Sequence, residues 1–91
     1  MRLSWTPAAA GDLENISNYL HDHHPQFAQL TVRRLYESIR ELSRFPRRGR
    51  PGREPGTREL ILSSLPYVIV FRPREHVVEI LRIYHGSQNW K

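Results

Sequence analysis

The C-terminal third of the chain, residues 56–90, reads GTRELILSSLPYVIVFRPREHVVEILRIYHGSQNW. β-Branched and aromatic residues gather there in three runs separated by serine, proline and charged residues, a pattern typical of strands. We predict strands at Thr57–Leu62, Tyr67–Arg72 and His76–Tyr84. Their connections are too short for the crossover that a parallel pair requires, so the three strands should form an antiparallel meander.

Two amphipathic helices are predicted before these strands. Apolar residues recur every three or four positions over Pro7–Asp22 and again over Pro25–Arg44. A proline opens each segment, where its missing N–H costs no hydrogen bond. The short link between the helices predicts an antiparallel hairpin. Arg2–Trp5 alternates apolar and polar residues and is predicted to be a strand that joins the meander.

Together these elements predict one α+β domain over residues 1–91. The order is β-α-α-β-β-β, with the helical hairpin packed on one face of a small antiparallel sheet. Both sides of the last strand are largely apolar, so the face that meets the helices stays open. If that strand is regular, Arg82 and His85 point to opposite faces, and a bulge or the strand end could bring them together.

Composition excludes several classes of function. The chain has no cysteine, so neither a disulfide framework nor a thiolate metal site is available. No apolar run could span a bilayer and no signal-like segment opens the chain, so we expect a cytoplasmic protein. His21, His23 and His24 lie where the first helix ends, and no fourth ligand follows at a recognisable spacing. We expect neither a metal nor a cofactor.

Arginine dominates the charge of the chain. Fourteen Lys+Arg stand against nine Asp+Glu, a formal net charge of +5, and Lys91 is the only lysine. Because arginine suits bidentate contacts with phosphate or carboxylate, we expect a nucleic acid or an acidic protein as partner. Pro46–Gly56, rich in proline, glycine and arginine, is predicted to be either a phosphate-binding loop or a plain linker. The candidate target- or phosphate-binding residues are Arg47, Arg48, Arg50, Arg53 and Arg72.

Motifs in a fixed order run along nearly the whole chain. They are Trp5-Thr6-Pro7-x-Ala9, Asp12-Leu13-x-x-Ile16-x-x-Tyr19, Phe45-Pro46-x-x-Gly49-Arg50, Gly56-Thr57-Arg58-Glu59-Leu60, Pro66-Tyr67-Val68-Ile69-Val70-Phe71 and Ile80-Leu81-Arg82-Ile83-Tyr84-His85-Gly86. In combination they resemble the RelE/ParE family, toxins of bacterial type II toxin–antitoxin modules. The resemblance implies the fold reached above and a toxin that inhibits growth when free of its antitoxin. It also implies an antitoxin, expected to be acidic and encoded next door, that lays a helix and an extended segment over the toxin.

The family divides by target, so three functions stay open. ParE-like members poison DNA gyrase, whereas RelE-like members are endonucleases that cut mRNA on the ribosome without metal. An inactive member would only bind its antitoxin and repress its own operon with it. For RNA cleavage, the resemblance implies His85 as base or acid, Arg58 and Arg82 as phosphate ligands, and Tyr67 or Tyr84 to orient the substrate.

Two departures from the RNA-cleaving pattern favour the ParE-like interpretation. RNA-cleaving members carry an arginine directly after the middle-strand tyrosine, where this chain has Val68. They also tend to have basic or carboxylate residues in the preceding strand, where this chain has Leu60, Ile61 and Leu62. The loss of one cation that stabilises a transition state can cost several kcal/mol.

The candidate catalytic side chains also have structural interpretations. The arginines could pair across strands, and the aromatic side chains near the end of the chain could pack or bond there. Such contacts would join Arg58 to Glu59, Arg82 to Glu59 or Glu79, His85 to the backbone that leaves the sheet, and Trp90 to the core.

Overall fold

A computed structural model describes residues 1–86 of the chain, so the predicted contact of Trp90 with the core lies outside the described residues. Two helices and four strands follow one another as the sequence predicts, and the structure adds one short strand, β2, and a 3-10 turn. The elements are β1 (Arg2–Trp5), α1 (Pro7–His23), α2 (Pro25–Arg40), η1 (Glu41–Ser43), β2 (Arg50–Pro51), β3 (Arg58–Ile61), β4 (Tyr67–Pro73) and β5 (Val77–His85).

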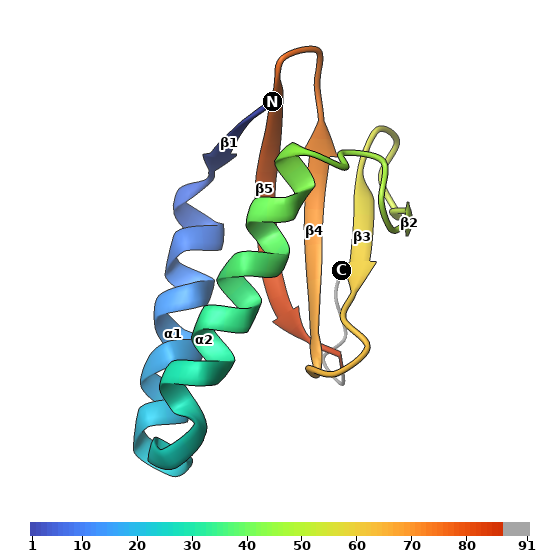
Figure 1. Cartoon of the computed structure of the whole chain (residues 1–91). Helices are drawn as coiled ribbons and strands as arrows, with labels where there is room; N and C mark the ends of the chain where they lie inside the picture. Colours follow the sequence, from blue (N-terminus) through green and yellow to red (C-terminus); the bar gives the residue numbers. More distant parts are fainter. Residues whose placement is uncertain (87–91) are drawn as a thin grey trace.

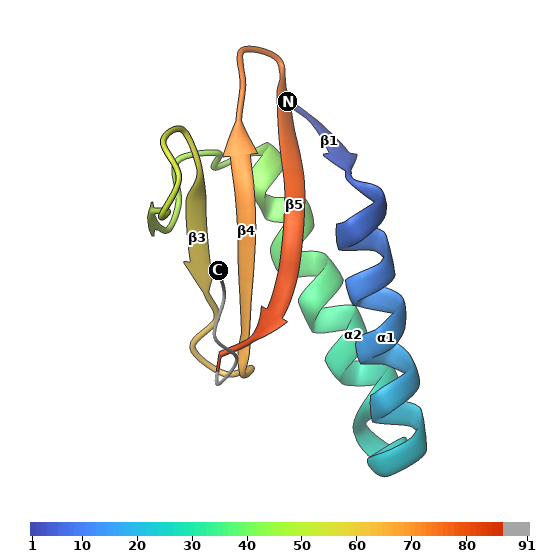
Figure 2. The same ribbon diagram turned by 180° about the vertical axis from the view of Figure 1, so that it is seen from behind.

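The helical hairpin covers one face of the sheet and extends beyond it at the turn between the helices (Figures 1 and 2). Thr6 caps α1, because its side-chain oxygen accepts a hydrogen bond of 3.0 Å from the amide of Ala9. α2 ends at Arg40, before the predicted boundary. The chain continues as the 3-10 turn η1, which still places Leu42 in the core.

The sheet has the strand order β1-β5-β4-β3-β2. β3, β4 and β5 form the predicted antiparallel meander. β1 pairs with β5 in parallel, from Arg2 beside Val77 to Trp5 beside Ile80, so the sheet is mixed and not wholly antiparallel. Parallel pairing is possible here because most of the chain, including both helices, lies between these two strands. β2 is a two-residue edge strand within the predicted loop, where the proline of Pro51 is tolerated.

A bulge interrupts β5. Val70 of β4 lies opposite Arg82, but the next residue, Phe71, lies opposite Ile80, so Leu81 is the additional residue on β5. Such a bulge shifts the alternation of side chains between the two faces of a strand. The two apolar runs of β5 that the sequence places on different sides are thereby brought to the same side.

This shift settles which face of β5 meets the helices. Ile80 and Ile83 both lie in the core, together with Leu35 and Ile39 of α2. After the bulge, alternation places Arg82 on the outer face and His85 on the helix side. The bulge therefore does not bring these two side chains together.

Candidate functional site

Tyr67 and His85 lie directly opposite each other at the ends of β4 and β5. Their rings meet edge to face, with centroids 5.8 Å apart. Tyr67 is buried, and this burial, together with the nearby Tyr19, raises the pKa of its hydroxyl. The structure thus brings Tyr67 and His85, two of the residues proposed for RNA cleavage, into contact.

Arg58 lies at the other end of the meander, opposite Phe71. Four residues of β4 separate this position from Tyr67, a distance of about 13 Å at the usual rise of a strand. The guanidinium of Arg58 donates hydrogen bonds to the backbone carbonyls of Arg48 (3.3 Å) and Gly49 (2.9 Å). Arg58 therefore anchors the arginine-rich loop and lies away from Tyr67 and His85.

Arg82 forms a bidentate ion pair with Asp12 of α1. Its Nε donates to Oδ2 at 2.8 Å and its Nη2 donates to Oδ1 at 3.0 Å. The amide of Ile83 donates a third hydrogen bond, of 2.8 Å, to the same carboxylate. Hydrogen bonding to Asp12 raises the pKa of the Arg82 guanidinium. This arginine holds α1 against the sheet at a point that β1 no longer reaches.

Glu59 and Glu79, the carboxylates expected from the sequence to pair with Arg82, form ion pairs with other arginines. Arg50 pairs with Glu59 at 3.0 Å and Arg74 pairs with Glu79 at 2.7 Å. The expected pairs of Arg82 with either glutamate, and of Arg58 with Glu59, are therefore wrong. Sequence spacing could not identify Asp12 as the partner, because the pair joins a helix to a strand across 70 residues.

The loop Pro46–Gly56 has defined contacts along its length. Gly49 has φ of +90°, and a side chain there would collide with the carbonyl oxygen of Glu59. The amide of Gly52 donates to the carbonyl of Thr57 at 2.8 Å. Together with the anchoring bonds of Arg58, these contacts fix the course of the loop along the sheet edge. Its arginines are therefore presented from a restrained backbone.

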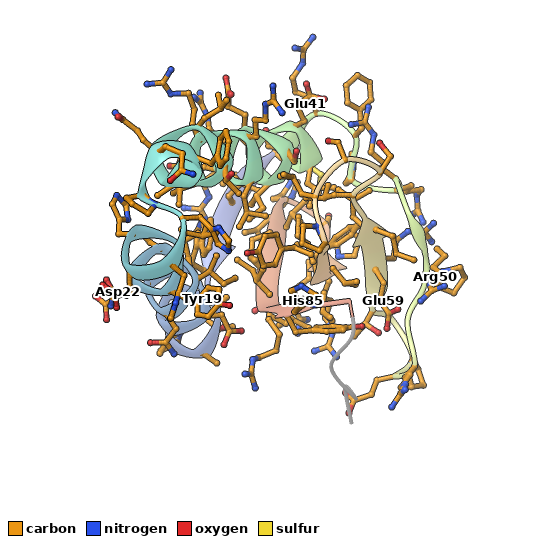
Figure 3. The ribbon with its side chains drawn as sticks, turned by 90° about the horizontal axis from the view of Figure 1, so that it is seen from below. Tyr19, Asp22, Glu41, Arg50, Glu59 and His85 are labelled. Atoms are coloured by element: carbon orange, nitrogen blue, oxygen red, sulfur yellow. The ribbon has the colours of Figure 1, made fainter. Side chains whose placement is uncertain are left out.

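The outer face of the sheet is hollowed beside this loop. The hollow has a volume of about 350 Å³ and is lined by Arg50, Arg53, Glu59 and Tyr84, among others. Glu59 is only 5% exposed and accepts from Arg50. Burial and the charge of Glu59 raise the pKa of Tyr84, while the two arginines lower it. Figure 3 shows Arg50 and Glu59 at one edge of the molecule, across the sheet from Tyr19.

A second hollow, the hairpin–sheet groove, lies between α1 and the ends of β4 and β5. Its volume is about 540 Å³, and Ile16, Leu20, Tyr67 and Ile83 give it an apolar lining. Tyr19 also lines the groove and is 56% exposed. Such a groove suits the apolar face of an amphipathic helix.

The edge of β3 is partly uncovered. β2 pairs with Arg58 and Glu59, and no strand within residues 1–86 pairs with Leu60 or Ile61 on that side. Ile61 is 52% exposed. A further hollow of about 520 Å³ separates this edge from α2. An unpaired edge of this kind can accept an extended peptide as an additional strand.

Across residues 1–86, no three His, Asp or Glu side chains gather as a group that could hold a metal ion. None of the helices described there is long and apolar enough to cross a membrane.

The fold is that of a class of small bacterial toxins. The isolated RelE toxin of E. coli superposes with a TM-score of 0.67 over 97% of this chain and 86% of that chain, and at 14% identity this likeness concerns the fold alone. The amino-acid sequence, in contrast, matches a family of toxins other than RelE. The family described as the ParE toxin of the type II toxin–antitoxin system, parDE, matches residues 3–90, and the chain belongs to this family.

Two relatives agree with this assignment. The chain is 38% identical to "Putative toxin Y4kP" of Sinorhizobium fredii over 89 residues, which are 98% of this chain and 92% of the relative. A chain of the chromosomal ParDE TA system from P. aeruginosa superposes with a TM-score of 0.83 at 33% identity, covering 93% of this chain and 95% of that chain. Membership of this toxin family implies a cognate antitoxin as partner.

Sequence reasoning missed two features of the site. Asp12 belongs to the motif Asp12-Leu13-x-x-Ile16-x-x-Tyr19, but no pattern in the sequence gives it a partner, although it lies three residues after the buried Ala9, beside the apolar stripe. A carboxylate at that position faces the protein and needs a donor. The combination of Glu59 and Tyr84 in one hollow was also missed, because it depends on the position of the bulge in β5.

Proposed function

We propose that this chain is a toxin that inhibits growth when free of its antitoxin and that it acts by poisoning DNA gyrase. The observation that carries the proposal is the match to the ParE toxin family over residues 3–90. Both this target and the alternative one, mRNA on the ribosome, are in the cytoplasm, where the toxin would act.

The arrangement of the candidate catalytic residues supports this target over RNA cleavage. Tyr67 and His85 are in contact, but Arg58 is bonded to loop carbonyls and Arg82 to Asp12. The position that carries an arginine in RNA-cleaving relatives is Val68, which is 6% exposed. A phosphorane-like transition state would therefore find few cations beside His85.

We further propose that the antitoxin uses two of the surfaces described above. A helix of the antitoxin would fill the apolar hairpin–sheet groove, and an extended segment would pair with the open edge of β3 at Leu60 and Ile61. An acidic antitoxin, encoded beside the toxin, would suit the formal charge of +5.

Induction of the chain in cells that lack the antitoxin tests the function. DNA, RNA and protein synthesis are followed separately after induction. We expect DNA synthesis to fall first, with double-strand breaks, an SOS response and filamentous cells. Growth arrest should persist in His85→Ala and Arg58→Ala variants that remain folded. Arrest of protein synthesis while DNA synthesis continues would contradict the proposal, and unimpaired growth would instead indicate an inactive, antitoxin-binding member.

The outer hollow supports a second candidate, a metal-independent, ribosome-associated mRNA endonuclease. Glu59 and Tyr84 could exchange protons with a ribose 2′-OH and a leaving 5′-oxygen, while Arg50 and Arg53 face the same hollow as cations for phosphate. This candidate predicts cuts at codons in the ribosomal A site. It also predicts that a folded Glu59→Gln variant loses both the cuts and the toxicity.

A further inference from the structure

The positive charge of the chain is concentrated in one segment. Residues 40–53 contain six arginines and one glutamate, a balance of +5, which equals the formal charge of the whole chain. The other 77 residues hold eight cations and eight anions. The electrostatic field of the protein therefore originates mainly from this segment.

This segment crosses from the end of α2 to the opposite edge of the sheet (Figure 1). After η1 the segment makes a tight turn, closed by a hydrogen bond of 3.1 Å from the amide of Arg48 to the carbonyl of Phe45. Pro46 and Arg47 form the tip of this turn, and a proline at that position restricts the backbone. Arg47 is thus held at an exposed and restrained position.

Two guanidinium groups pack against the ring of Phe45. Those of Arg44 and Arg48 lie 5.7 Å and 4.8 Å from its centroid, and the ring remains 47% exposed. Such stacking orients a guanidinium and leaves its charge and its N–H edge available. Arg44, Phe45, Arg47 and Arg48 are here named the Phe45 cluster.

Acidic side chains neutralise the positive charge of the Phe45 cluster only in part. Glu41 is the single acidic residue of the segment, and it pairs with Arg48 at 3.0 Å. Among the ion pairs of residues 1–86, none involves Arg44 or Arg47. An exposed set of arginines whose charge is only partly neutralised by carboxylates suits a polyanion.

We propose that the Phe45 cluster binds the phosphodiester backbone of duplex DNA without reading its sequence. Guanidiniums already cover part of the ring of Phe45, so backbone contact is favoured over the base stacking by which single strands are bound. The biological role of this binding rests on the proposed function. A toxin that binds DNA would be retained near the sites where gyrase cuts it.

Fluorescence anisotropy of the purified toxin with labelled duplexes of about 20 base pairs tests this inference. Two duplexes of unrelated sequence should bind with the same affinity. Contact of three arginines with phosphates predicts a slope of about −2.7 for log K against log salt concentration. Arg44→Ala and Arg47→Ala should each weaken binding several-fold and make the slope shallower by about 0.9.

Two further variants control for charge and for folding. Arg33→Ala removes the same charge from an exposed position on α2, outside the cluster, and should leave binding nearly unchanged. Phe45→Leu keeps every charge and should weaken binding about threefold by releasing the stacked guanidiniums. Circular dichroism establishes that each variant is folded.

Three outcomes would overturn the inference. They are the absence of saturable binding at about 50 mM salt, an equal loss of affinity in Arg33→Ala, and tighter binding of a single-stranded RNA of the same length than of duplex DNA. Gyrase-dependent DNA breakage, assayed separately, distinguishes the two proposals. If wild-type toxin binds duplex DNA as described but causes no breakage, the gyrase target fails while DNA binding stands.

Discussion

Asp12 of α1 and Arg82 of β5 form a bidentate ion pair with N–O distances of 2.8 and 3.0 Å. The same carboxylate accepts the amide of Ile83, so it takes the place of a strand partner where β1 has ended. Because a bulge at Leu81 turns Arg82 outward, the pair depends on the irregularity of β5. One carboxylate thereby joins the helical hairpin to the sheet.

Replacement of Asp12 by alanine should lower the free energy of unfolding by about 2–3 kcal/mol. The change removes the carboxylate that accepts from both Arg82 and the Ile83 amide in a partly buried place. Urea denaturation of the purified toxin measures the effect. Glu14→Ala, at an exposed position of the same helix, is the control and should change stability by less than about 0.5 kcal/mol. Equal stability of the two variants would contradict the structural role of Asp12.

Alanine at Gly49 should destabilise the protein by at least about 1 kcal/mol. The left-handed backbone and the collision with the carbonyl of Glu59 both oppose a side chain there. Gly11→Ala is the matched control, because a Cβ in the middle of α1 meets nothing within 4 Å. That change should instead stabilise by about 0.5–1 kcal/mol. Thermal unfolding of both variants checks the opposite signs.

Ile61→Lys should weaken antitoxin binding at least tenfold with little effect on the toxin alone. Ile61 is 52% exposed at the open edge of β3, so its replacement removes few internal contacts. Isothermal titration with the cognate antitoxin measures the affinity. Leu30→Lys, at a half-exposed position of α2 away from that edge, is the control. Undiminished binding by Ile61→Lys would exclude strand addition at this edge.

Stability should decline above about pH 10. Burial raises the pKa of Tyr67 and of Tyr84, so both ionise at lower pH in the unfolded chain than in the folded protein. Their contribution is fully present below the unfolded pKa and is lost as pH rises through the folded pKa. Urea denaturation at several pH values, with tyrosinate absorbance, checks this sign. The decline should be smaller in Tyr67→Phe, and an unchanged decline would assign it to other groups.

Local patterns predicted the hairpin and the meander, because helical periodicity and short turns are read from neighbouring residues. The parallel pairing of β1 with β5 could not be predicted, since it joins Arg2–Trp5 to residues more than 70 positions later. Nor does the sequence reveal the bulge. The residue Leu81 is as apolar as its neighbours, and its position follows from the pairing with β4.

In the candidate site, too, local patterns predict some features, and contacts between distant residues determine the others. The pairing of Tyr67 with His85 follows from the meander and its register. The roles of Arg58 and Arg82 depend on a loop carbonyl and on a helix carboxylate, respectively, which no spacing within the strands indicates. Whether the loop of Pro46–Gly56 is restrained likewise depended on tertiary contacts, above all the anchoring by Arg58.

The proposed poisoning of gyrase is tested most directly with purified gyrase, supercoiled plasmid and purified toxin. After denaturation and protease treatment, we predict linear DNA that increases with toxin concentration and disappears when the antitoxin is added in excess. Intact plasmid at toxin concentrations in excess of gyrase, together with A-site cleavage of mRNA in a reconstituted translation reaction, would contradict the account.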